Sequence, residues 1–362
     1  MRKTLTRCAL LLLGLLIAMS AGWGVLAILF TGPADALLRY SLASAFAVVA
    51  LAALVALGSR RWRGRTLALA LHLAQFAAVL LCWYRLEPSN ERDWQADVAL
   101  LPHATIDGDL VTLHNIRNFD YRSETDYTPA WYDKQFDLRK LRGVDLITSY
   151  WMGPAIAHVF LSFDFGDGDH LAMSIETRKE KGESYSTLKG FFRQYELYYV
   201  VADERDVIRL RTNYRRNPPE NVYLYQLHAP IEQGRQLFLE YMQRINALQH
   251  QPEFYNSLTT NCTTAMWLNS RVNPQHPPFD WRIIASGYVP QFLYQHGLLD
   301  SAGLPFAEVR RRAQINARAQ AADDAADFSR RIRMDAPAQP ADRSDPAAAD
   351  PATGKAQGTR AE

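Results

Sequence analysis

The sequence predicts an α+β domain, built on a mostly antiparallel sheet with helices and preceded by three transmembrane helices. Three observations lead to this prediction. Long apolar runs crowd the first 85 of the 362 residues. Between residues 99 and 306, several segments alternate polar and apolar residues with the period of a strand, and helical patterns stand beside them in the chain. Such strands with helices grouped beside them are typical of an α+β fold.

The three apolar runs cover Cys8–Phe30, Ser41–Gly58 and residues 65–85. Each is close to the ~20 residues that a helix needs to cross the hydrocarbon of a bilayer, and a helix satisfies its own backbone groups there. The lipid bilayer is therefore an expected partner. A cleaved signal peptide is the alternative for the first run, and it would leave two spans and the same outward domain.

Positive charges set the expected orientation of these spans. Arg2, Lys3 and Arg7 precede the first run, and four arginines at positions 60, 61, 63 and 65 fill the loop between the second and third runs. Both places should be cytoplasmic. We therefore expect a multi-pass protein of the bacterial inner membrane, with a cytoplasmic N-terminus and a periplasmic domain. The arginine loop disfavours a buried hairpin of a soluble protein.

Composition divides the chain into five parts. These are a transmembrane region (1–86), a polar linker (87–98), an outer domain (99–306), a helical extension (307–334) and a tail (335–362). The tail is rich in Ala, Pro and Asp and has too few large apolar residues to offset its ordering entropy, so we expect disorder there. The net charge of +2 gives no reason to expect a nucleic-acid partner. No Cys/His spacing resembles a zinc site, and no metal or cofactor is expected.

Within the outer domain, strands and helices are expected at nine places. The predicted strands are Asp109–Leu113, Val144–Trp151, Ile156–Phe165, His170–Arg178, Glu196–Val201 and Val222–Leu227. The predicted helices are Ser186–Gln194, Ile231–Leu248 and Thr263–Val272, and a short basic helix is expected at Glu308–Ala319 in the extension.

One predicted hairpin brings a histidine and a glutamate together. Gly166-Asp167-Gly168 joins its two strands and offers glycines for positive φ. A three-residue loop pairs Phe165 with Asp169 and lays the apolar sets of both strands side by side. The same register places His158 opposite Glu176, about 5 Å apart at Cβ. The carboxylate can then orient the imidazole and stabilise its protonated form. A surface ion pair is the simpler interpretation of this pair by itself.

Cys262 is the only cysteine in the outer domain; the other two, Cys8 and Cys82, lie at or in the predicted spans. Structural cysteines in an oxidising compartment come in pairs, so a single one is either a buried small hydrophobe or a working thiol. Thr260 and Asn261 are good N-cap residues before a helical pattern. Cys262 therefore lies in a first helical turn, where unpaired N–H groups and the helix dipole favour a thiolate and can bind an oxyanion.

Cys262, His158 and Glu176 together supply a nucleophile, a base and an orienting carboxylate. Their surroundings resemble the family of Lnb-type periplasmic domains, over roughly residues 107–267. The matching motifs are Ala157–Phe163, Ser174–Arg178, Thr260–Thr264, Asn115–Phe119 and Glu204–Val207. The resemblance implies a permuted papain-like fold, related to NlpC-type hydrolases and lecithin:retinol acyltransferase, in which the His-bearing hairpin precedes the Cys-bearing helix.

The resemblance also implies an activity, namely acyl transfer from a lipid-modified glycerol to the amino group of a lipoprotein's N-terminal cysteine. A lipid-modified protein or phospholipid is then the expected substrate. A cell-wall peptidase or amidase of NlpC type and a non-catalytic envelope assembly protein are the alternatives.

Three residues have weaker supporting roles in this prediction. Arg178 can pair with Glu176 or with a lipid phosphate. Asn261 can donate to an oxyanion, although capping is its simpler role. Tyr150 precedes the His158 strand and either lines a cleft or packs in the core.

Overall fold

The computed structural model describes residues 2–59 and 62–334. Contacts divide the chain into two compact units. The first comprises residues 1–95, 177–197 and 252–258, and the second comprises the remainder of the described chain. The predicted tail, 335–362, lies outside the described residues.

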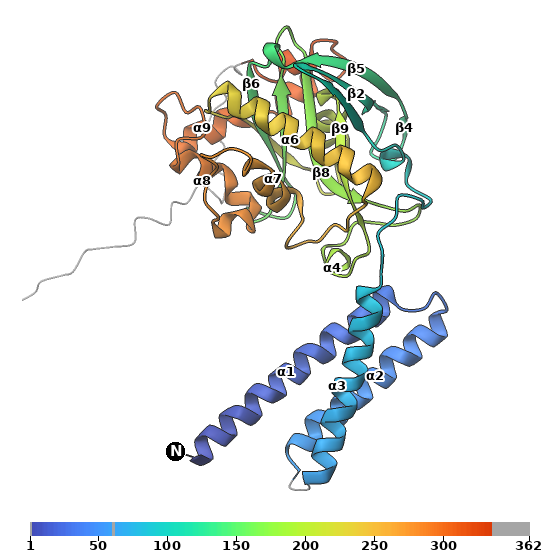
Figure 1. Ribbon diagram of the computed structural model, residues 1–362. Helices are drawn as coiled ribbons and strands as arrows, with labels where there is room; N and C mark the ends of the chain where they lie inside the picture. Colours follow the sequence, from blue (N-terminus) through green and yellow to red (C-terminus); the bar gives the residue numbers. More distant parts are fainter. Residues whose placement is uncertain (1, 60–61, 335–362) are drawn as a thin grey trace, which may run out of the picture. The chain divides into compact units, whose positions relative to one another are not determined.

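The first unit contains three long helices, α1 (Arg2–Thr31), α2 (Ala36–Leu57) and α3 (Trp62–Tyr84) (Figure 1). All three are long and apolar enough to cross a membrane, which confirms the three spans expected from the sequence. Polar side chains join them inside the bundle. Ser20 of α1 meets His72 of α3 at 2.8 Å, and Gln75 of α3 donates to the carbonyl of Phe46 in α2 at 3.0 Å.

An eight-stranded sheet forms the frame of the outer domain. The strand order is β1-β2-β9-β8-β7-β6-β10, with β5 also paired to β2. The registered pairs are antiparallel apart from β2 with β9, which confirms a mostly antiparallel α+β fold. The strands are β1 (His103–Asp107), β2 (Leu110–Arg117), β5 (Trp131–Asp137), β6 (Gly143–Tyr150), β7 (His158–Asp164), β8 (His170–Arg178), β9 (Glu196–Ala202) and β10 (Asn221–Gln226), and a separate small sheet pairs β3 (Asp120–Tyr121) with β4 (Tyr127–Thr128).

All six predicted strands are present, and the sequence analysis missed β1 and β5 as well as the small sheet. The α-helices of the domain and extension are α4 (Thr187–Gly190), α5 (Glu204–Arg209), α6 (Ile231–His250), α7 (Cys262–Ser270), α8 (Val289–Gln295), α9 (Phe306–Ala313), α10 (Asn316–Ala321) and α11 (Phe328–Arg331). Short turns are η1 (Ala96–Val98), η2 (Leu138–Lys140), η4 (Trp281–Ile283) and η5 (Ser286–Tyr288), and a π-helix, η3 (Leu210–Tyr214), continues α5.

The core lies between the sheet and α6, which crosses one face of it (Figure 1). Phe163 of β7 packs edge-on against Phe238 and Tyr241 of α6, with ring centroids 5.1 and 6.1 Å apart. The apolar face of β7 that the hairpin pattern predicted therefore packs against α6. Such aromatic pairs add to the free energy gained by burying the rings.

Two predicted helices differ from the structure. The helix expected at Ser186–Gln194 ends at Gly190, and Arg193 has a φ of 53°, which a helix cannot contain. The helix expected at Glu308–Ala319 is two helices, α9 and α10. Gln314 between them is extended and pairs with Tyr223 of β10, so the edge of the sheet interrupts the helix.

Candidate active site

The β7–β8 hairpin has the register that its sequence pattern predicted. Phe163 pairs with Leu171, and the backbone N–H of Phe165 donates to Asp169 across the loop at 2.9 Å. The same register places His158 opposite Glu176, and His158 Nε2 lies 3.4 Å from Glu176 Oε1. The spatial part of the prediction is therefore confirmed.

Cys262 is the first residue of α7, and Asn261 caps this helix. Asn261 Oδ1 accepts from the backbone N–H groups of Thr263 and Thr264 at 3.0 and 2.9 Å, and Thr264 Oγ1 accepts from the N–H of Asn261 in return. This reciprocal capping box explains why the helix begins here.

The cap corrects one expectation about the oxyanion. We expected the amides of the first turn to receive it, but two of them already bind Asn261. Within the described chain no hydrogen bond engages the backbone N–H of Cys262, which is one of the four donors that a helix start leaves unpaired. The amide of Cys262 is thus the first-turn donor that would be available to an oxyanion.

The thiol of Cys262 and the imidazole of His158 interact closely enough for each to shift the pKa of the other. Burial raises the pKa of the thiol, but the charge of His158, the hydrogen bond from its ring and the N–H of Val159 lower it further, to about 7. Burial and the Arg211 cation lower the pKa of His158, whereas Cys262 and Glu176 raise it to above its ordinary value. The pair therefore favours thiolate and imidazolium near neutral pH.

Ser174 stands between the histidine and the glutamate. Its hydroxyl lies 2.6 Å from His158 Nε2 and donates to Glu176 Oε1 at 2.8 Å. Because Nε2 is engaged on this side, Nδ1 is the ring nitrogen that remains for the sulfur of Cys262. The sequence analysis missed Ser174, which is a buried strand residue two positions before the glutamate on the same face of β8.

Arg211 fixes the charge of Glu176 from the far side. Its guanidinium is buried and reaches Glu176 Oε1 at 3.0 Å and Glu220 Oε2 at 3.1 Å. Burial raises the pKa of Glu176, but the hydrogen bond with His158 and the Arg211 cation lower it well below its usual value. Arg215 and Ser149 also bind Glu220. The carboxylate behind His158 is therefore ionised, and this whole second layer was missed by the sequence analysis.

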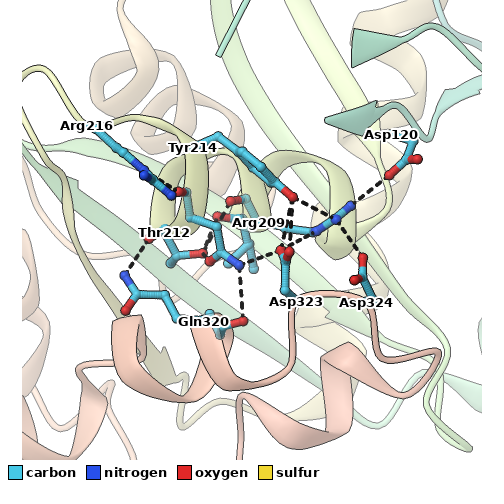
Figure 2. Close-up of polar contacts among 11 residues, drawn as sticks. Asp120, Arg209, Thr212, Tyr214, Arg216, Gln320, Asp323 and Asp324 are labelled. Carbon is cyan, nitrogen blue, oxygen red and sulfur yellow. Dashed lines mark hydrogen bonds and ion pairs between the residues drawn. The ribbon is translucent and has the colours of Figure 1, made fainter. Parts of the chain in front are cut away.

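Arg211 lies on the π-helix η3, and contacts from three other segments hold this turn in place. Figure 2 shows the neighbouring Arg209, whose buried guanidinium reaches Asp323 at 2.7 Å and both Asp120 and Asp324 at 3.1 Å. Gln320 of α10 donates to the carbonyl of Thr212 at 3.0 Å. The C-terminal extension thus packs against the turn that presents Arg211 to Glu176. π-Helical turns are frequent at functional sites.

The three supporting residues have structural positions. Asn261 is the cap described above. Tyr150 is buried, donates its hydroxyl to the carbonyl of Gly287 at 2.7 Å and packs edge-on against Tyr223, so core packing is the correct interpretation. Arg178 donates to Asn90 at 3.0 Å and lies over the ring of Trp94 at 4.3 Å. Glu176 pairs with Arg211, a cation that the sequence analysis did not name, whereas a lipid phosphate as a partner of Arg178 stays a prediction.

An apolar cavity of about 180 Å³ lies along α7, the helix that begins at Cys262. Its wall includes Thr263, Met266 and Trp267 of α7, which share one helical face, together with Leu161 of β7 and Leu237 of α6. Thr263 also touches the thiol, with its Oγ1 3.6 Å from Cys262 Sγ. In the described part of the chain, no cluster of three His, Cys, Asp or Glu side chains is arranged to hold a metal ion.

Comparison with known families agrees with the resemblance seen in the sequence. Residues 127–287 match the model of the Lnb N-terminal periplasmic domain, and this segment contains His158, Glu176 and Cys262. The match confirms the family that the motifs indicated, and with the three apolar helices it describes a membrane-associated protein with a periplasmic domain. The motif at Asn115–Phe119 lies outside the matched segment. Comparisons with curated proteins and with solved structures find no match.

Proposed function

From the premise of an Lnb-type periplasmic domain that follows three apolar helices, we propose that this protein is a cysteine acyltransferase. It acts on lipid-linked substrates such as bacterial lipoproteins, through an acyl-enzyme on Cys262. It is anchored in the inner membrane with its N-terminus in the cytoplasm and its catalytic domain in the periplasm. The observation that carries this proposal is the electrostatic pairing of Cys262 with His158, whose Nε2 lies 3.4 Å from the ionised Glu176.

The first half-reaction forms the acyl-enzyme. The Cys262 thiolate attacks an ester carbonyl carbon, and the resulting oxyanion accepts a hydrogen bond from the backbone N–H of Cys262. Collapse of this intermediate breaks the bond from carbon to the ester oxygen. The imidazolium of His158 gives its proton to the departing alkoxide, so a free alcohol and a thioester remain.

The second half-reaction moves the acyl group to an amine. The amine attacks the thioester carbon, His158 takes the proton that the nitrogen loses, and the carbon–sulfur bond breaks. The products are an amide and the thiolate–imidazolium pair that began the cycle. Glu176 stays ionised throughout and holds the ring through Ser174.

The apolar lining of the cavity favours an acyl chain over a peptide as the substrate. Its wall along α7 is made mainly by aliphatic and aromatic side chains, and one wall residue, Thr263, contacts the thiol of Cys262 through Oγ1. An apolar cavity binds a hydrocarbon chain by removing both surfaces from water, whereas a peptide would leave its polar backbone unpaired there. A cell-wall peptidase would need a more polar cleft.

The test uses the purified full chain and a synthetic lipopeptide whose N-terminal cysteine carries two ester-linked acyl chains. We expect the acyl group to appear on the lipopeptide amine, and a hydroxylamine-sensitive acyl adduct to appear by mass spectrometry on the peptide that contains Cys262. Cys262→Ser should abolish both signals while its melting temperature stays unchanged. Cys82→Ser is the matched control, because it removes a thiol from α3 and should leave both signals intact.

Two results would overturn the proposal. One is acyl transfer that persists in Cys262→Ala. The other is cleavage of peptide bonds in muropeptides by the wild-type chain without any acyl transfer, which would support the cell-wall peptidase. A chain whose Cys262 stays unmodified by thiol reagents at neutral pH would support a non-catalytic assembly protein instead.

A further inference from the structure

An exposed apolar patch belongs to the compact unit that contains the membrane helices. It consists of Tyr185, Leu188, Phe191 and Leu258, whose side chains are 48, 46, 38 and 45% exposed. The first three lie on and around α4, and Leu258 lies in the segment that leads to α7. Single exposed apolar residues are ordinary, whereas several on neighbouring loops mark a contact surface.

Hydrogen bonds bring the two loops of the patch together. Ser257, next to Leu258, donates its hydroxyl to the carbonyl of Thr187 at 2.7 Å, and its backbone N–H donates to Gly190 at 3.3 Å. A Cβ atom at Gly190 would collide with the hydroxyl of Ser257, so this close approach requires the glycine. The patch is thus one surface that spans two chain segments.

The residues that follow the patch are packed on the ends of the membrane helices. Phe192 is buried against Trp23 and Phe30 of α1, with ring centroids 6.1 and 5.4 Å apart. Arg193 lies 3.9 Å above the ring of Trp83 in α3 and donates to the carbonyl of Trp83 at 3.0 Å. Trp residues and the long side chains of Arg are typical of the level at which a membrane helix meets water.

From this continuity we propose that the patch formed by Tyr185, Leu188, Phe191 and Leu258 inserts into the outer leaflet of the membrane that α1, α2 and α3 cross. The lipid surface is its partner, because the same loop is anchored at the ends of the helices that this surface surrounds. Burial of these side chains among acyl chains removes them from water, as for interfacial amphipathic segments. The inference concerns membrane contact and does not depend on acyl transfer.

The insertion has a consequence for the nucleophile. Leu258 precedes Cys262 by four residues, and a chain of that length spans at most about 14 Å when fully extended. A patch that is seated in the leaflet therefore tethers the start of α7 close to the lipid surface.

The experiment measures the depth of single labelled positions in the full chain. In a chain with Cys8→Ser, Cys82→Ser and Cys262→Ser, the variants Leu188→Cys and Leu258→Cys carry an environment-sensitive fluorophore. The matched control is Ile106→Cys, because Ile106 is 41% exposed on β1 and lies outside this unit. Each protein is reconstituted in vesicles of phosphatidylethanolamine and phosphatidylglycerol, with or without lipids that are brominated on the acyl chains.

We expect blue-shifted emission from positions 188 and 258 and its loss in brominated vesicles, with neither effect at position 106. Emission at 188 and 258 that matches position 106 in colour and in quenching would overturn the proposal. The measurement uses a chain without the Cys262 thiol, so its outcome does not depend on whether the protein is an acyltransferase. If the labels at positions 188 and 258 are deeply quenched but the unlabelled wild-type chain transfers no acyl group, the proposed function alone is refuted.

Discussion

Replacement of His158 by Gln tests whether the imidazole activates the thiol. In the wild-type protein the pKa of Cys262 is about 7, against an ordinary value of 9.0, because His158 outweighs the effect of burial. His158→Gln removes the charge and leaves the burial, so the pKa should rise to 9.0 or higher. At pH 7 the thiolate fraction then falls from about one half to about one hundredth, which is roughly 50-fold.

The measured rate should fall less than the thiolate fraction does. A more basic thiolate is a better nucleophile. With a Brønsted slope of about 0.4–0.5, a rise of two pKa units increases the rate constant of the thiolate by up to roughly tenfold. The expected loss in reaction rate at pH 7 is therefore about five- to tenfold with an uncharged aromatic disulfide as the reagent. The midpoint of the rate–pH profile is the sharper readout, since it should move by about two pH units.

The assay follows release of the aromatic thiol in a Cys8→Ser, Cys82→Ser background, so that only Cys262 reports. His114→Gln is the control, because His114 pairs with Asp133 on another strand and should leave the midpoint near 7. Melting temperatures verify that both variants are folded. A midpoint that stays near 7 in His158→Gln would refute the argument that the imidazole lowers the pKa of the thiol.

Three further predictions concern the layers behind the histidine. Ser174→Ala should slow acyl-enzyme formation about fivefold, because the buried hydrogen bond that holds the His158 ring is lost, a contribution of about 1 kcal/mol; Ser174→Thr should restore the rate in a single-turnover assay. Asp323→Asn with Asp324→Asn should lower the melting temperature, since Asp120 is then the one carboxylate left of the three that pair with the buried Arg209. Asp327→Asn should not, because its partners Arg330 and Arg331 lie on its own helix. The pKa values of Glu204 and Glu220 are about 2, so their contribution to stability is complete above pH ~4.5 and is lost as the pH falls toward 2; thermal melts across this range should show the decline, and a flat profile would contradict it.

The positions of His158 and Cys262 in their elements were predictable because both are set by local sequence. The hairpin register follows from a three-residue loop and the period-two alternation of its strands, and a slip by one residue would turn every side chain to the opposite face of the sheet. The position of Cys262 follows from the cap formed by Asn261 and Thr264, three residues apart. Neither inference needs a contact between distant parts of the chain.

The layer behind Glu176 was not predictable because it depends on distant segments. Arg211 follows Glu176 by 35 residues and reaches it from a π-helix, for which no local pattern exists. One signal was present in the sequence. Residues 204–211 mix charged residues with Val, Ile and Leu, which are usually buried. Arg209 and Arg211 are indeed buried with them. In the extension, Asp323 and Asp324 stand in an alanine-rich stretch that resembles solvated surface, so their pairing with Arg209 was missed.

Arg211 lowers the pKa of both Glu176 and His158, which favours the charged form of the first and the neutral form of the second. It lowers the pKa of Glu176 and so keeps a buried carboxylate ionised, which burial alone would prevent. It also lowers the pKa of His158, and thereby opposes the imidazolium that Glu176 and Cys262 favour. The guanidinium therefore limits how far the pKa of His158 rises, while it keeps Glu176 ionised.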